Sequence, residues 1–325
     1  MKKILITAKN NLKQAQNYSK MGILFLSLML VSCETLINDV DQSRLPAGES
    51  KLVVHGYLSP QDTLIQISVA HSSDVFGALN YSNSGNLTSI PDATVRISNQ
   101  GKTFTLPFDA KNGTYSISAK AMPIIVGQTY TLNIDFQGKS VTSSCTVPKA
   151  VAIKEVRVDS INSRNVQSSN PNFIPPKDYL YRLLWQDAAG ETNFYRVAGY
   201  VLETLKVQTT PNKFEERINI NSIYFWNNGR NGELISDQRS DGELLISETG
   251  RYSNLYGNST GTTLLKKRIE LMLLSCEKSY YDYHRTIQDF DRDNPFAEPS
   301  LVFSNIKGGL GCFAAYNRSS IVLKG

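Results

Sequence analysis

Short runs of alternating apolar and polar residues follow one another from residue 51 to residue 147. Such alternation places every second side chain on the same face of a β-strand. The pairs Asn112-Gly113 and Gln137-Gly138 each lie between two runs, as in a tight hairpin turn. The pattern predicts strands at 51–57, 63–70, 94–99, 103–106, 113–119, 129–136 and 139–147. Strands at this spacing are typical of an immunoglobulin-like β-sandwich, which we place at residues 51–150.

A second stretch of strand-like runs follows Pro148, a residue that cannot continue a central strand. We expect a second β-rich domain over residues 151–325. Its predicted strands are 153–159, 179–186, 192–205, 217–226, 243–247, 264–276, 301–304, 311–316 and 320–323. The fold class predicted for the whole chain is therefore mainly β.

One segment of the second region has a helical pattern instead. Tyr280, Tyr283, Ile287 and Phe290 recur at spacings of three and four residues, which places them on one face of a helix. Ser279 precedes them and is a residue type that caps helices. The pattern predicts one short amphipathic helix with its aromatic face on the second sheet.

The first 32 residues form a separate unit. Positively charged residues without any acidic residue precede an apolar run at 21–31, an order typical of secretory signals. The run is shorter than the roughly 20 residues that a transmembrane helix needs. Leu30-Val31-Ser32-Cys33 resembles the lipobox of bacterial lipoproteins, in which the cysteine is acylated after cleavage. We expect a signal peptide at 1–32, lipid on Cys33 that holds the protein on a membrane, and a flexible tether at 33–50.

Removal of the signal peptide changes the charge of the protein. The 34 basic residues less the five lysines of the signal leave 29, against 29 acidic residues. The mature chain is therefore close to neutral and shows no basic stripe, so we expect no nucleic-acid partner. Outside Cys33 the cysteines are Cys145, Cys276 and Cys312, which allow at most one internal disulfide or three buried thiols. Spacing does not choose between these alternatives.

Three blocks of the mature sequence resemble the DUF4249 family of lipoproteins of Bacteroidota. They are Leu52-Val53-Val54-His55-Gly56-Tyr57-Leu58-Ser59-Pro60, the run Ile90-Pro91-Asp92-Ala93-Thr94-Val95-Arg96-Ile97, and the stretch 294–313 with Gly308-Gly309-Leu310-Gly311-Cys312-Phe313. The resemblance implies an outer-membrane lipoprotein without an assigned activity or cofactor, often encoded beside a TonB-dependent transporter. It therefore implies a non-catalytic accessory or ligand-capture protein that works with such a transporter. Glu34, Asp39 and Asp41 resemble a surface-export signal and favour the cell surface over the periplasm.

Tyr224, Trp226 and Arg230 are the predicted ligand-binding residues. They place aromatic rings beside a guanidinium, as on surfaces that bind sugars or peptides. Alternation puts Tyr224 and Trp226 on one face of a strand and Phe225 on the other. The alternative is that one of these faces is simply core.

Asp289, Asp291 and Asp293 begin like a calcium-binding loop. Asn294 stands where that loop requires glycine, and Ser300 stands where it requires glutamate. A solvated acidic end of the helix is the alternative interpretation. We predict no other metal site, because the histidines are too scattered for zinc.

Ser259 lies in the sequence Gly257-Asn258-Ser259-Thr260-Gly261, which matches the pattern of a hydrolase nucleophile elbow. His284 is the only later histidine that could serve as its base, and a polar turn explains the same residues. Two rival functions stay open at this point. One is a surface hydrolase of glycans or peptides, and the other is a structural or adhesion module.

Overall fold

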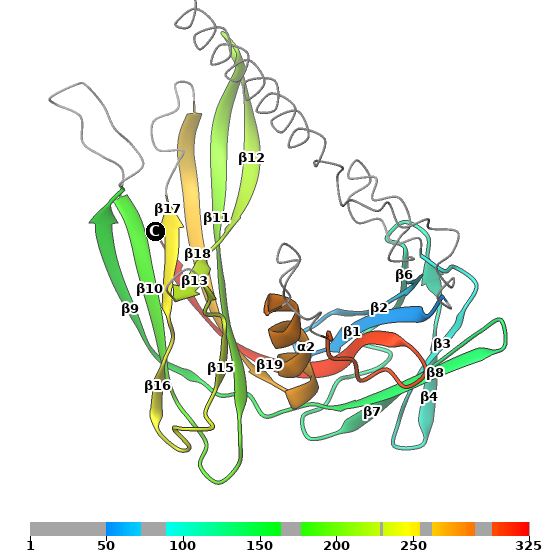
Figure 1. The fold of residues 1–325 in the computed structure, drawn as a ribbon. Helices are drawn as coiled ribbons and strands as arrows, with labels where there is room; N and C mark the ends of the chain where they lie inside the picture. The colour runs from blue at the N-terminus through cyan, green and yellow to red at the C-terminus, as the bar shows by residue number, and fades with distance from the viewer. Residues whose placement is uncertain are drawn as a thin grey trace, which may run out of the picture. The chain divides into compact units, whose positions relative to one another are not determined.

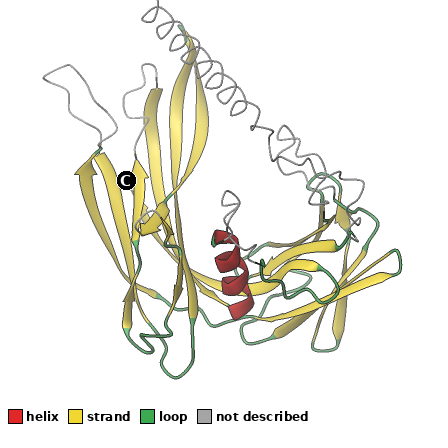
Figure 2. Ribbon diagram, in the orientation of Figure 1, coloured by secondary structure: helices red, strands yellow, loops and turns green. Residues whose placement is uncertain are grey.

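The computed structural model describes residues 50–72, 89–163, 177–227, 230–253, 262–289 and 301–324 (Figure 1). Strands dominate these residues, and α2 (Lys278–Gln288) is the helix among them (Figure 2). The predicted mainly β fold is confirmed. In the same residues no helix is long and apolar enough to cross a membrane. The predicted signal peptide, Cys33 and the tether up to residue 49 lie outside the described part of the chain.

The first region is a sandwich of two antiparallel layers. One layer, of order β1-β2-β6-β5, is one end of a large sheet that continues from β1 into strand β19 (Leu310–Lys324), and the other is a separate sheet of order β4-β3-β7-β8. These orders correspond to the A-B-E-D and C′-C-F-G sheets of immunoglobulin-like domains, which confirms that prediction. The strands are β1 (Leu52–Leu58), β2 (Leu64–His71), β3 (Thr94–Asn99), β4 (Lys102–Leu106), β5 (Phe108–Asp109), β6 (Thr114–Ser118), β7 (Thr129–Phe136) and β8 (Lys139–Thr146).

Tyr130, at the start of β7, fixes one corner of this sandwich. Its hydroxyl donates to the Pro123 carbonyl at 2.8 Å and accepts from the Ile125 amide at 2.9 Å. This is the tyrosine corner of immunoglobulin-like domains. Gln137 and Gly138 both have positive φ angles, as the predicted hairpin turn requires.

The C-terminal strand β19 (Leu310–Lys324) joins the two regions of the chain. Its first half pairs in parallel with β1, and its second half pairs antiparallel with β18 (Thr262–Cys276) (Figure 1). Gly311 lies opposite Val54 with a φ of 107°, and a Cβ there would lie 2.0 Å from the Val54 carbonyl oxygen. Only glycine therefore allows the two strands to pair at this point.

The second region is also built from two facing layers. One layer is formed by β11 and β18 of the large sheet, and the other is the sheet of order β14-β13-β17-β10-β16, with β9 beside β10. Tyr181, Val197, Phe225 and Leu271 are buried between the layers. The further strands are β9 (Ile153–Asn162), β10 (Lys177–Gln186), β11 (Phe194–Thr210), β12 (Lys213–Ser222), β13 (Tyr224–Asn227), β14 (Arg230–Asn231), β15 (Leu234–Ser236), β16 (Leu244–Ile246) and β17 (Thr249–Ser253).

Helix α2 covers the other face of the large sheet. Tyr280 and Tyr283 are buried there in one cluster with Leu274 and Cys312. The predicted cap is wrong, because Glu277 is the N-cap residue and Ser279 lies within the helix. The side chain of Glu277 instead accepts from the backbone amides of strands β8 and β19.

Several predicted strands differ from the structure, among them 217–226, which is divided between β12 and β13. Residues 301–304 are not a strand. The strands predicted at 311–316 and 320–323 are one continuous strand, because the run of polar residues between them keeps its pairing with β18. The boundary predicted near residue 150 stays a prediction, although Glu49–Gly325 form one compact unit that β19 helps to hold together.

Candidate ligand-binding cleft

A cleft of about 560 Å³ opens between the two layers of the second region. Strands β9 and β10 form one side of it, and strands β18 and β19 form the other. Its volume falls in the range of small-molecule sites, roughly 300–1,000 Å³. The lining residues are Val158, Tyr179, Tyr181, Leu264, Leu265, Lys266, Lys267, Ile269, Leu323 and Lys324.

An irregularity in β18 helps to explain the apolar wall of the cleft. Leu264 pairs with Leu205 and Lys266 pairs with Thr204, which leaves Leu265 as an extra residue without a partner on β11. A bulge of this kind bends the strand and redirects its side chains. Leu264 and Leu265 are 45% and 48% exposed, although both are large apolar residues.

Lys267 supplies a positive charge in the cleft. Its Nζ lies 4.6 Å from the centre of the Tyr179 ring and 4.8 Å from that of Tyr252. Burial lowers its pKa, and the nearby Glu203 carboxylate acts in the opposite direction. Among the described residues no carboxylate forms an ion pair with Lys267, although Glu203 lies opposite it in the pairing of β11 with β18 and acts on its charge.

Tyr181 adds a buried hydroxyl to the lining of the cleft. The side chain is 1% exposed, and its hydroxyl has no hydrogen-bond partner within the described part of the chain. A buried polar group without a hydrogen-bond partner lowers the stability of the fold by about 1–3 kcal/mol, and such groups are rare in folded cores. Burial, followed by the neighbouring Tyr179, raises the pKa of Tyr181 to about 12, so the hydroxyl stays protonated and can donate.

The predicted binding residues lie away from this cleft. Tyr224 and Trp226 are 57% and 52% exposed, whereas Phe225 between them is 1% exposed and packs in the core. The alternation of the two faces is as predicted, and the two exposed rings lie on the outer face of β13. The Arg230 backbone pairs with Asn227 in a short hairpin, and its side chain is outside what the structure describes. Whether this outer face binds a ligand stays a prediction.

The remaining sequence candidates do not meet in a described site. Asp289 ends α2 and accepts a hydrogen bond of 3.0 Å from Arg285, while Asp291, Asp293 and Ser259 lie outside the described residues. His284 belongs to α2 and packs against the rings of Tyr57 and Tyr280, and burial lowers its pKa to about 4.

The cysteines outside the signal region are not paired with one another. Cys145, Cys276 and Cys312 are free thiols, and all three are buried. Burial raises the pKa of the Cys312 thiol to about 12, and the neighbouring Glu277 acts in the same direction. This is the environment of structural rather than reactive cysteines.

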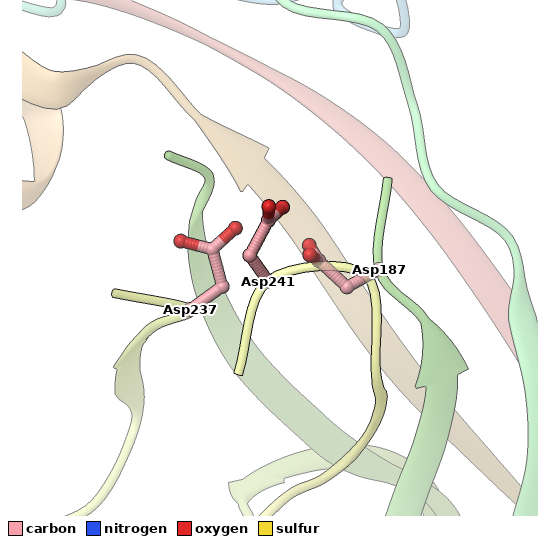
Figure 3. A group of neighbouring side chains, drawn as sticks. All are labelled: Asp187, Asp237 and Asp241. Carbon is pink, nitrogen blue, oxygen red and sulfur yellow. The ribbon is translucent and has the colours of Figure 1, made fainter. Parts of the chain in front are cut away.

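Three acidic side chains meet elsewhere in the second region. Asp187 follows β10, and Asp237 and Asp241 lie in the loop between β15 and β16, with carboxylate oxygens within 4.8 Å of one another (Figure 3). Burial, together with the neighbouring Asp187, raises the pKa of Asp237. Carboxylates so placed could hold a hard divalent cation such as Ca²⁺.

Hydrogen bonds within the loops already explain where these carboxylates lie. Asp187 accepts from the Tyr195 hydroxyl at 2.5 Å and from the Gly242 amide at 2.8 Å. Asp237 accepts from the Asn193 amide, and Asp241 accepts from the Gly190 amide, each at 2.9 Å. The group therefore fastens the turn after β10 to the loop before β16, with or without a metal.

The fold and the cleft together define a two-layer β protein whose second region can take a small molecule between its sheets. The sequence comparison places the chain more closely. It belongs to the family described as Domain of unknown function (DUF4249), which matches residues 36–321. No curated protein matches the chain.

Sequence reasoning missed both the cleft and the acidic group. Tyr179 and Tyr181 are two residues apart and so lie on the same face of one strand. The pair Lys266-Lys267 interrupts an otherwise strand-like run. Both features are signals of a polar site on a sheet. The bulge that brings these residues to one cleft cannot be recognised from a local sequence pattern. Asp187 and Asp237 are separated by a long stretch of chain without a shared motif.

Proposed function

We propose that this protein is a lipid-anchored protein of the outer membrane that binds a small ligand in the β10–β18 cleft and presents it to a TonB-dependent transporter. The observation that carries the proposal is the cleft itself. It combines exposed apolar residues with a lysine that forms no ion pair among the described residues and with a buried hydroxyl that has no hydrogen-bond partner there. A few convergent polar groups in an apolar cleft are typical of small-molecule sites.

The sequence supports the envelope location and the partner. The lipobox at Leu30-Val31-Ser32-Cys33 supports anchoring through acyl chains on Cys33. Two or more acyl chains hold a protein on a membrane far more firmly than one. The resemblance to DUF4249 lipoproteins, together with membership of that family, supports the association with a TonB-dependent transporter.

Binding is favoured over the two rival functions. The described residues that line the cleft include no carboxylate or histidine, so they supply no acid–base pair for hydrolysis. His284, the only later histidine that could serve Ser259, lies on α2 and packs among tyrosine rings. The role of a structural or adhesion module does not explain a cleft that holds a half-buried lysine and a hydroxyl without a hydrogen-bond partner among the described residues.

Affinity purification from detergent-solubilised membranes tests the function. The full chain with a C-terminal tag should recover a TonB-dependent transporter in amounts comparable to its own. The matched control is Cys33→Ala, which should lose lipid labelling and recover much less of the transporter. Recovery of other envelope complexes without any transporter would contradict the proposed partner.

A further inference from the structure

The side chains of the cleft form a gradient of burial, and the chemistry changes along it. Tyr181 and Ile269 are buried, Lys267 is half-buried, and Val158, Leu264 and Leu265 are exposed. Lys267 and Tyr181 therefore lie toward the buried end beside Ile269, and Val158, Leu264 and Leu265 line the way out together with the exposed Lys266 and Lys324. Large apolar side chains exposed outside a half-buried lysine depart from an ordinary protein surface, where apolar groups are buried and charges are solvated.

The buried end of the cleft combines a positive charge with a hydroxyl donor. The Lys267 ammonium lies over two ring faces, which attract the cation but accept none of its three N–H groups in the ordinary way. The Tyr181 hydroxyl belongs to the same face of β10 as Tyr179 and has a proton to donate. An oxyanion placed between them would satisfy both donors with charge-assisted hydrogen bonds.

Glu203 limits the charge that this anion can carry. It is 1% exposed, and it accepts a 2.6 Å hydrogen bond from the hydroxyl of Tyr252, one of the rings beneath Lys267. Its carboxylate already offsets part of the lysine charge. A second negative charge on the ligand would face repulsion from Glu203, so a monoanion fits better than a phosphate dianion.

The exposed part of the cleft requires a hydrocarbon chain. Val158, Leu264 and Leu265 are 52%, 45% and 48% exposed, and they lie together rather than scattered. Contact with an apolar chain removes this surface from water at a gain proportional to its area. Lys266 and Lys324, which are exposed at the same cleft, are solvated and contribute little to the binding of a buried anion.

We propose that the cleft binds a single acyl chain with a carboxylate head, as in a fatty acid. The head contacts Lys267 and Tyr181, and the chain runs outward along Leu264, Leu265 and Val158. This assignment rests on the proposed ligand-binding role of the cleft and names the class of its ligand.

Photo-crosslinking in membranes that carry the full chain tests this assignment. The probe is a palmitate with a diazirine midway along its chain, and the labelled peptides are identified by mass spectrometry. We expect label on peptides from β9, β18 and β19 that contain Val158, Leu265 or Leu323. Excess oleate should suppress this label, whereas oleyl alcohol, which has no charge, and butyrate, which has no long chain, should not.

Matched variants separate a site from general partitioning. Lys267→Met should lower the label in the cleft by about tenfold or more, because it removes a charged hydrogen bond. Lys206→Met is the control, since Lys206 also lies over a ring, that of Phe214 at 4.7 Å, but outside the cleft. It should leave the label unchanged. Tyr181→Phe removes only the hydroxyl and provides a second test should Lys267→Met fail to fold.

Label spread evenly over the chain, or label that folded Lys267→Met and Tyr181→Phe both retain, would overturn the assignment. If oleyl alcohol competed as well as oleate, the assignment of a carboxylate head to the ligand would be overturned. The experiment uses no transporter, so its result is distinguishable from the test of the proposed function. If the affinity purification recovered no transporter while the photo-crosslinking still labelled the cleft, the proposed partner would be rejected and the proposed ligand would stand.

Discussion

The two sandwiches use the same architecture but differ in how completely they are closed. In the first sandwich, inward residues from both sheets fill one continuous core, and few large apolar residues are exposed. In the second, many large apolar side chains on β9, β12, β13, β16 and β18 are exposed, and a cleft lies between the layers. The first sandwich is thus closed around its core, whereas the second leaves apolar surface exposed, as the proposed ligand site requires.

The largest expected effect comes from the strand that the two sandwiches share. Gly311→Ala should destabilise the protein by about 3 kcal/mol or more, because a Cβ would collide with the Val54 carbonyl and the positive φ is strained. Chemical denaturation measures this. Gly127→Ala is the control, with a φ of 77° and no heavy atom within 4 Å of the added Cβ. A loss no larger than that of the control would mean that β19 does not hold the regions together.

Two tyrosines sharpen the contrast between the sandwiches. Tyr130→Phe should cost about 2 kcal/mol, because two backbone groups lose their partner in the closed sandwich. Tyr181→Phe should cost almost nothing or stabilise the protein, since its hydroxyl has no partner in the described residues. Thermal unfolding of the two variants provides the comparison. Equal losses would show that the hydroxyl of Tyr181 is bonded within the protein and is not reserved for a ligand.

Glu277 connects the first sandwich to β19 in a way that depends on pH. Its carboxylate accepts from the Thr146 and Ala315 amides, and burial raises its pKa from 4.5 to about 7. The folded protein therefore keeps a proton that the unfolded chain releases between these two values. The titration of Glu277 therefore makes the free energy of unfolding fall as the pH rises from 4.5 to about 7, by about 1–2 kcal/mol once solvent screening is allowed for.

The variant Glu277→Gln removes the titrating group and should remove this fall. The quantity to measure is the difference in unfolding free energy between wild type and variant from pH 4.5 to pH 8. A difference is needed because His284, whose pKa is lowered to about 4, makes stability rise with pH below 6.5. A difference that does not change with pH would mean that Glu277 has an ordinary pKa.

The smallest effect is expected on the outer face of β13. Tyr224→Ala and Trp226→Ala should each change stability by less than about 1 kcal/mol, because both rings are more than half exposed. Phe225→Ala, at a buried position, should cost about 3–5 kcal/mol. Denaturation of the three variants checks the alternation. A large loss at Trp226 would mean that this face is covered by another part of the protein.

The two regions also differ in how far the sequence predicted them. Strands in the first sandwich match closely, for example 94–99 and 129–136, because each is short, alternates strictly and ends in a turn residue such as Gly138. In the second region, long strands change partner along their length, as β19 does between β1 and β18, and residues 301–304 lack the partner strand that their composition suggested. Local pattern determines a hairpin, but it does not determine which sheet a distant strand joins.

The candidate site was less predictable for the same reason. Tyr224 and Trp226 were correctly placed on one face, yet their exposure alone does not make a pocket. The cleft depends on pairing between strands that are far apart in sequence, and on the bulge at Leu265 that redirects one wall. Neither depends on a local motif. The contacts of Lys267 with Tyr179 and Tyr252 become visible only once the strands are assembled.

The central claim is that the cleft of the second sandwich holds a small molecule, and filling it tests this most directly. Leu265→Trp should occupy the cleft, whereas Leu64→Trp adds the same side chain at a comparably exposed position, 41%, in the first sandwich. The measurement is mass spectrometry of small molecules released on denaturing each purified full-length protein. We predict one molecule that wild type and Leu64→Trp carry and Leu265→Trp lacks; the same molecules from all three proteins, or none from any, would contradict the account.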